Sequence, residues 1–158
     1  MKEIVVMLDN IRSNENVGSI FRTSDAAGVS KIYLVGITPA PLDRFNRVNK
    51  GLAKAALGAE KMVEWEKAES LKEVVGKLKD AKMERWKIIG IEQDKNSVDY
   101  HLISNSYNLA FVFGNEVDGL SKEDIELCDE IVEIPMKGKK ESLNVAVAAG
   151  IILFNNLS

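Results

Sequence analysis

The chain contains very few of the residues that support redox or metal chemistry. It has one cysteine, Cys128, and one histidine, His101, among its 158 residues. A single thiol can form neither an internal disulfide nor a multi-thiolate metal site. His101 stands in a polar stretch, which is typical of a solvent-facing side chain, and Cys128 ends an amphipathic stretch, which is typical of a small buried apolar residue. We therefore expect no bound metal and no Ser-His-Asp triad.

Long apolar runs and an excess of basic charge are also missing. No run reaches the roughly 18 residues that a membrane-spanning helix needs. The first ten residues place Glu3 beside Lys2 and lead directly into an apolar stretch, so we expect no signal peptide, no membrane partner and a cytoplasmic location. The net charge of −3 argues against a protein that wraps duplex DNA, but it leaves room for RNA binding through a local basic patch.

Three widespread fingerprints are absent as well. The sequence contains no G-x-G-x-x-G after its first apolar stretch, no G-x-x-x-x-G-K-[ST] and no G-x-S-x-G. A Rossmann dinucleotide loop, a P-loop and a nucleophile elbow are therefore unsupported. A nucleotide-binding oxidoreductase is kept only as a weaker alternative.

Apolar stretches typical of buried strands alternate with stretches typical of amphipathic helices. We expect strands at residues 3–8, 31–36, 61–66, 86–92, 109–114 and 130–135. We expect helices at 16–28, 69–82, 121–128 and 143–156, with one or two helical turns within 51–60. Gly28 is a natural left-handed end for the first helix, and Ser121 a natural N-cap for the third. The alternation predicts a single α/β domain over residues 1–158, with a mostly parallel sheet flanked by helices.

The carboxyl ends of the predicted strands are the expected place for a site, because ligands of parallel sheets bind there. Three strands end in glycine or proline followed by polar groups, within residues 88–94, 111–121 and 133–144. Arg22 in the first predicted helix has the apolar neighbours Ile20 and Phe21, an unusual setting for a solvated arginine. A guanidinium is a poor proton acceptor, but it can bind a phosphate or stabilise an oxygen that gains negative charge.

Two basic patches are candidates for contact with RNA. One patch comprises Arg44, Arg47, Lys50 and Lys54, and the other comprises Lys137, Lys139 and Lys140. Ordinary solvated surface charge remains an alternative for both.

Three stretches, taken in order, resemble a known family. Residues 14–29 (NENVGSIFRTSDAAGV), 109–121 (LAFVFGNEVDGLS) and 134–154 (IPMKGKKESLNVAVAAGIILF) resemble the three motifs of the SpoU/TrmH family of SPOUT-class RNA 2′-O-ribose methyltransferases. The resemblance extends from residue 3 to the C-terminus. It implies an S-adenosylmethionine-dependent enzyme, a trefoil knot in the C-terminal third, and a homodimer with active sites near the subunit interface.

The resemblance also assigns roles to individual residues. Arg22 would clamp the RNA phosphate and the developing alkoxide, and Asn16 would fix the loop that presents it. Glu116 and Asn144 would orient the groups around the methyl donor. The cofactor pocket would consist of Ile91, Gly114, Ile134, Met136, Ser142 and Leu143. Gly114 and Gly138 would let the backbone approach the ligand, and the small residues Ala146, Ala148, Ala149 and Gly150 would let the last helix pack closely against the rest of the chain and the partner subunit.

The substrate follows less directly from the resemblance. Many family members carry an extra N-terminal RNA-binding domain, and we expect none here, so RNA recognition would depend on Arg44, Arg47, Lys50 and Lys139. A compact core favours a small structured target, which makes tRNA preferable to ribosomal RNA. A non-catalytic RNA-binding dimer of the same fold is the main alternative, and the presence of all four candidate catalytic residues argues against it.

Overall fold

The computed structural model describes residues 2–80 and 85–157, and a parallel sheet forms the centre of this part of the chain. The strands are β1 (Ile4–Asp9), β2 (Lys31–Val35), β3 (Glu64–Ala68), β4 (Trp86–Ile91), β5 (Val98–Asp99), β6 (Asn108–Phe113) and β7 (Glu130–Glu133). They lie in the order β3-β2-β1-β6-β4-β7-β5, and each pairing among them is parallel. The predicted α/β class with a mostly parallel sheet is confirmed.

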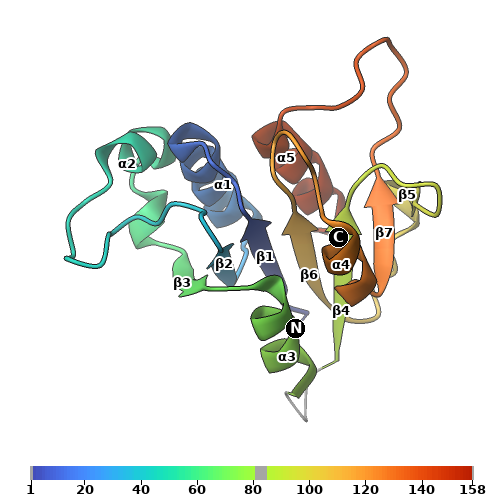
Figure 1. Cartoon of the computed structure of the whole chain (residues 1–158), viewed down its shortest axis with the longest axis horizontal. Helices are drawn as coiled ribbons and strands as arrows, with labels where there is room; N and C mark the ends of the chain where they lie inside the picture. Colours follow the sequence, from blue (N-terminus) through green and yellow to red (C-terminus); the bar gives the residue numbers. More distant parts are fainter. Residues whose placement is uncertain (1, 81–84, 158) are drawn as a thin grey trace.

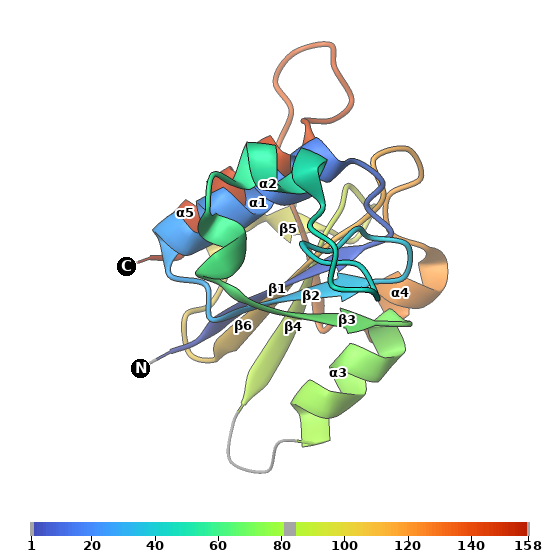
Figure 2. The same ribbon diagram turned by 90° about the vertical axis from the view of Figure 1, so that its left-hand side faces the viewer.

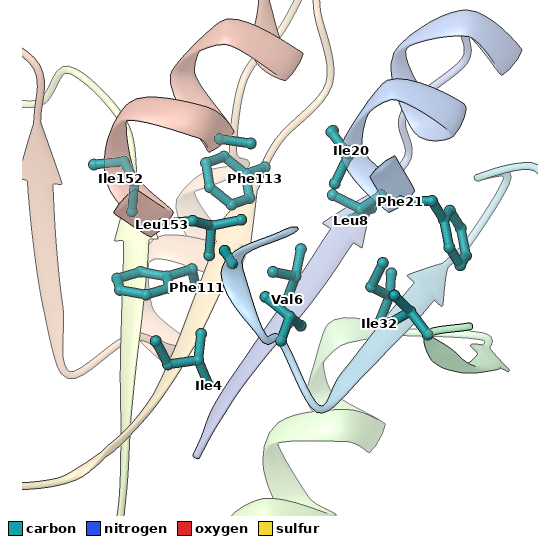
Figure 3. Packing of buried hydrophobic residues seen from close by; sticks show 14 of the residues in the cluster. Ile4, Val6, Leu8, Ile20, Phe21, Ile32, Phe111, Phe113, Ile152 and Leu153 are labelled. Carbon is teal, nitrogen blue, oxygen red and sulfur yellow. The ribbon is translucent and has the colours of Figure 1, made fainter. Parts of the chain in front are cut away.

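Helices cover both faces of the sheet. On one face lie α1 (Asn14–Ala27), α2 (Lys50–Ala56) and α5 (Val145–Asn155), and on the other lie α3 (Leu71–Asp80) and α4 (Lys122–Leu127), as Figures 1 and 2 show. Successive strand residues point to opposite faces, so β1 supplies Ile4, Val6 and Leu8 to one core cluster. Val5 and Met7 belong to the other cluster. Figure 3 shows the first cluster, where β1, β6 and the two helices α1 and α5 meet.

Local signals set the ends of α1 and its position beside α2. The Ser13 hydroxyl accepts a hydrogen bond from the Asn16 N–H at 3.1 Å, and Gly28 ends the helix in the left-handed conformation with φ of 75°, as predicted. Gly18 lies where α1 crosses α2. A β-carbon added there would stand 2.4 Å from the Leu52 carbonyl oxygen, so only glycine permits this approach.

The structure corrects one predicted boundary and contains two elements that were not predicted. The strand predicted from residue 61 begins at Glu64, because a 3₁₀ turn, η1 (Ala59–Lys61), occupies the preceding residues. The polar segment that contains His101 holds β5 and a second 3₁₀ turn, η2 (Tyr100–Leu102), neither of which was predicted. A two-residue strand carries no usable periodic pattern.

The other predicted elements lie within a few residues of their expected bounds. The helix predicted over 69–82 spans Leu71–Asp80, and residues 81 and 82 fall outside the described residues. Ser121 caps α4 through a hydrogen bond from the Asp124 N–H at 3.1 Å, as predicted. The trefoil knot stays a prediction. No helix among residues 2–80 and 85–157 is both long and apolar enough to cross a membrane.

Candidate functional site

A cavity of about 650 Å³ opens at the carboxyl ends of β4, β6 and β7. The loops of residues 114–120 and 134–144 surround it, and the second of these projects well beyond the sheet (Figures 1 and 2). All six predicted cofactor residues line it, namely Ile91, Gly114, Ile134, Met136, Ser142 and Leu143. Three of the four predicted catalytic residues, Asn16, Glu116 and Asn144, line it as well. Folding therefore gathers residues from four separate stretches of the chain around one cavity.

The chemical character of the cavity wall is apolar and acidic. Strand ends and the start of α5 contribute the apolar residues Ile91, Phe113 and Val145. The wall also carries five carboxylates, from Glu92, Glu116, Asp118, Glu133 and Glu141, and no lysine, arginine or histidine among the described residues that line it. Such a wall favours a ligand with an apolar body and positive charge, and it disfavours a phosphorylated ligand, whose charge would be repelled.

A chain of three side chains joins the two helix starts to the loop between them. The Asn144 amide donates to the Asn16 side-chain oxygen at 3.1 Å, and the Asn16 amide donates to Glu116 Oε1 at 3.5 Å. The Glu116 carboxylate also accepts from the backbone N–H groups of Arg12 and Ser13, at 3.2 and 3.3 Å. The start of α1, the 114–120 loop and the start of α5 are thereby held together on one side of the cavity.

Glu116 acts in this arrangement as an ionised acceptor. Burial by itself raises the pKa of Glu116, but hydrogen bonds from its own backbone N–H, from those of Arg12 and Ser13, and from Asn16 outweigh burial and leave the pKa below its ordinary value. A carboxylate with this many donors is a weak proton acceptor. Glu116 is therefore a positioning residue that fixes Asn16 and the start of α1.

Asn144 has a second task as the N-cap of α5. Its side-chain oxygen accepts from the backbone N–H groups of Ala146 and Val147, at 2.8 and 3.3 Å. The same side chain thus starts the helix with its oxygen and reaches α1 with its nitrogen. One residue sets both the beginning of α5 and the orientation of Asn16.

The structure gives a reason for glycine at position 114 in addition to the predicted approach to the ligand, which stays a prediction. A β-carbon at this position would lie 2.5 Å from the Gly119 carbonyl carbon and 2.7 Å from the Leu120 nitrogen, so the loop folds back onto its own backbone. A β-carbon at Gly138 would meet nothing within 4 Å among the described residues. The close approach at Gly114 is between two parts of the loop, and it shapes the cavity wall before any ligand binds.

Glu92 and Asn115 are pocket residues that sequence reasoning missed. Asn115 accepts from the Val117 and Asp118 N–H groups and donates to the Asn10 carbonyl at 2.7 Å, which ties the loop to the end of β1. Glu92 accepts from the Leu120 N–H at 2.8 Å. Their positions just after β6 and β4 were the only signal available, because Asn10 and Leu120, the partners that tie them to other segments, are 105 and 28 residues away.

The predicted RNA-contacting cations lie outside the cavity. Arg22 is exposed on α1 and, within the described part of the chain, forms no side-chain hydrogen bond or ion pair. Arg44, Arg47, Lys50 and Lys139 are exposed as well, and none of them lines the cavity. In one copy of the chain, the cavity and the cations are therefore separate.

The remaining reactive side chains have ordinary structural surroundings. His101 is largely exposed, as predicted, and its Nδ1 lies 2.8 Å from Asp99 Oδ1. Cys128 is half-buried rather than fully buried, and burial, followed by the charges of Asp124, Asp129 and Asp9, raises the pKa of its thiol to about 12. No group of three potential metal ligands occurs among residues 2–80 and 85–157.

Comparison with known proteins places these features in context. The model of the SpoU rRNA Methylase family matches residues 3–154. The tRNA (guanosine(18)-2′-O)-methyltransferase of Aquifex aeolicus is 33% identical over 153 residues, which cover 97% of this chain and 68% of that protein. The 23S rRNA (guanosine-2′-O-)-methyltransferase RlmB of Neisseria meningitidis is 35% identical over 150 residues, which cover 95% of this chain and 56% of that protein.

Two solved structures with bound AdoMet share the fold. The rRNA methyltransferase of Sinorhizobium meliloti aligns with a TM-score of 0.86 and 31% identity over 98% of this chain and 55% of its own. The SpoU methyltransferase AviRb of Streptomyces viridochromogenes aligns with a TM-score of 0.86 and 27% identity over 99% of this chain and 60% of its own. The present chain thus spans between about half and two thirds of the length of the proteins it matches.

Proposed function

Because this chain belongs to the SpoU rRNA methylase family, we propose that it is an RNA 2′-O-ribose methyltransferase that uses S-adenosylmethionine. The observation that carries the proposal is the cavity wall, which is apolar and carries five carboxylates and no cation among its described residues. S-adenosylmethionine has an apolar purine and a positively charged sulfur, so it fits this wall. The pyrophosphate of a nicotinamide cofactor would face repulsion there, which argues against the oxidoreductase alternative.

Some residues of the cavity wall would bind the cofactor, and others hold the wall in position. Ile91, Ile134 and Leu143 offer apolar surface for the cofactor, and Ser142 offers a hydroxyl. The cofactor supplies a methyl group that its sulfonium already activates for transfer. Asn144, Asn16 and Glu116 hold the cavity wall in one arrangement, so the reacting groups can be presented in line without a further change in the protein.

The ribose hydroxyl needs a cation nearby as it loses its proton, and one copy of the chain does not supply it at the cavity. We therefore propose that a homodimer forms through α1 and α5 and that Arg22 of one subunit serves the cavity of the other. α5 is apolar on all sides, yet Val147 and Phe154 are each 51% exposed. These two residues are seven apart and share one helix face. A second copy packed on that face would bury them.

Arg22 lies on the outward side of α1, where such a copy would approach. Glu15, Ser19, Arg22 and Ala26 follow one another at helical spacing along that side. A guanidinium brought to the partner's cavity can clamp the RNA phosphate and stabilise the developing alkoxide, while the proton passes to phosphate or water. Arg44, Arg47, Lys50 and Lys139 would hold the RNA backbone, and we propose tRNA as the substrate.

The proposal is tested first by ligand choice and then by transfer. Calorimetric titration should show binding of S-adenosylmethionine and none of NAD. Transfer of a labelled methyl group should follow to transcribed tRNA, with fragments of 23S rRNA as the competing substrate. Binding of NAD alone would refute the proposal, and binding of cofactor and RNA with no transfer to any RNA would favour the non-catalytic dimer.

A mixed dimer tests whether Arg22 acts across the interface. Arg22→Ala removes the guanidinium, and Ser142→Trp fills the cavity from its exposed rim. Each variant alone should be inactive. A mixture that exchanges subunits should regain about a quarter of the wild-type activity, because half of the dimers are mixed and each then has one complete site. No recovery in a mixture shown to exchange subunits would place Arg22 and the cavity in the same chain.

A further inference from the structure

The loop of residues 42–48, which connects β2 to α2, presents an exposed phenyl ring between two arginines. Phe45 is 62% exposed, although it is a large apolar side chain. The guanidinium carbon of Arg44 lies 4.8 Å from the centre of its ring, and that of Arg47 lies 5.0 Å from it. We call these three residues the Phe45 platform.

The loop holds this ring in place by an internal hydrogen-bond network. The Asp43 carboxylate accepts from the backbone N–H groups of Phe45 and Arg47, at 2.8 and 3.0 Å. The Asp43 and Arg47 backbones also pair, and Leu42 forms a β-bridge with Val48. Asn46 takes the left-handed conformation that this tight turn requires, with φ of 61°. The exposed ring therefore sits on a structured turn.

The two arginines are bound to the platform in different ways. Arg47 Nε donates to Asp43 Oδ2 at 2.8 Å, so its guanidinium is anchored beside the ring. Arg44 forms no hydrogen bond or ion pair in the described part of the chain, where its guanidinium interacts only with the Phe45 ring. Arg44 can thus leave the ring without breaking a polar contact, and its place is then open to another flat group.

We propose that the Phe45 platform binds an unpaired RNA base by stacking, with Arg44 moving from the ring to the adjacent phosphate. This inference rests on the proposed RNA substrate and adds to it a site for a nucleotide that is not the methylated one. Aromatic rings beside cations bind single-stranded nucleic acid because each base has a face to stack and each nucleotide a phosphate to neutralise. A duplex hides its base faces, so the platform selects unpaired nucleotides.

The position of the loop fits a nucleotide several positions away from the reacting one. The loop follows β2, whose carboxyl end lies at the same sheet edge as the cavity, and Figure 1 shows it at the outer end of the molecule, beyond β2 and α2. β2 is separated from β6 by β1 alone, so the ends of these two strands lie roughly 10 Å apart, and the loop extends outward from the end of β2. A single strand of RNA that spans several nucleotides can therefore contact both places.

Binding of defined RNAs tests the platform with matched variants. The probes are a fluorescent twelve-nucleotide oligoadenylate and a twelve-base-pair RNA duplex, measured by anisotropy at several salt concentrations. Phe45→Leu should weaken single-strand binding about 5- to 100-fold, and Phe45→Tyr should bind as the wild type does. Val48→Ala removes exposed apolar surface from the same loop and should change nothing, since Val48 lies outside the platform.

The salt dependence separates stacking from charge. Phe45→Leu should leave the slope of log affinity against log salt unchanged, whereas Arg44→Ala should reduce that slope by about 1. With an RNA that the wild type methylates, Phe45→Leu should raise KM and leave kcat close to that of the wild type.

The outcomes distinguish this inference from the proposed function. If the wild type binds and methylates RNA and Phe45→Leu binds oligoadenylate equally well, the platform serves some other partner and the stacking proposal is overturned alone. An equal loss of duplex and single-strand binding would also overturn it, because stacking requires exposed bases. A wild type that neither binds nor methylates any of these RNAs would overturn both proposals.

Discussion

Asn144 offers the sharpest test of how the cavity is held together, because its two ends do different work. Its oxygen caps α5 and its nitrogen donates to Asn16. Asn144→Ala removes both contacts. Loss of an N-cap costs about 1 kcal/mol, and loss of one exposed hydrogen bond costs about 0.5 kcal/mol. The sum of about 1.5 kcal/mol should lower Tm by about 3–6 °C in a chain of this size.

Asn144→Asp separates the two contacts. A carboxylate still caps the helix, and it suits the positive end of the helix dipole, so stability should stay within about 0.5 kcal/mol of the wild type. The carboxylate cannot donate to Asn16, so the chain from Asn144 to Glu116 is broken in both variants. We expect methyl transfer to fall in both and stability to fall in the alanine variant only.

The assays are thermal and urea unfolding, cofactor titration and single-turnover methyl transfer. Lys140→Ala is the control for stability, because Lys140 is exposed in the same loop and has no side-chain hydrogen bond or ion pair within the described chain. If the aspartate variant is as unstable as the alanine variant, the cap is not what stabilises α5. If the aspartate variant transfers methyl groups normally, the bond to Asn16 is not needed.

Three further predictions concern glycine contacts and a buried acid. Gly114→Ala should lower stability by about 1–3 kcal/mol in urea unfolding, because its β-carbon would meet the Gly119 backbone, and full stability would show that the loop can shift. Gly18→Ala should lower the free energy of unfolding by a similar amount, because the added β-carbon would push α1 away from α2. Gly76→Ala in α3 is the control and should be neutral or stabilising, because a β-carbon there would meet no described residue within 4 Å. Burial, with the nearby Asp124 carboxyl, raises the pKa of Asp9 to about 8, so the folded chain keeps a proton that the unfolded chain releases above about pH 4. The contribution of Asp9 to the free energy of unfolding should be fully present below pH 4 and decline towards pH 8 by up to about 1.4 kcal/mol per pH unit. Asp9→Asn should remove this decline. The same decline in the asparagine variant would contradict this origin.

Local patterns in the sequence were enough to predict the layers of the fold. Apolar runs such as residues 4–8 predict buried parallel strands, and helices with one apolar face between them predict an α/β sheet covered on both sides. Turn chemistry placed the end of α1 at Gly28 and the start of α4 at Ser121. These features depend on neighbours within a few residues, and such neighbours are visible in a sequence. The short β5 was missed because two residues carry no period.

The tertiary structure alone decided how the site is built. Asn144 and Asn16 are 128 residues apart, and no local pattern shows that one donates to the other. Likewise, Glu92 in the cavity wall accepts a hydrogen bond from the Leu120 N–H, and these two residues are 28 positions apart. Gly114 could be predicted as a special position, but only the folded loop shows that the Gly119 backbone is what it accommodates. The position of Arg22 could not be predicted either. Asn16, in the same motif, lines the cavity, but the Arg22 side chain lies on the exposed side of α1. A sequence records which residues are present, but the direction in which each side chain points depends on contacts that form only when distant segments meet.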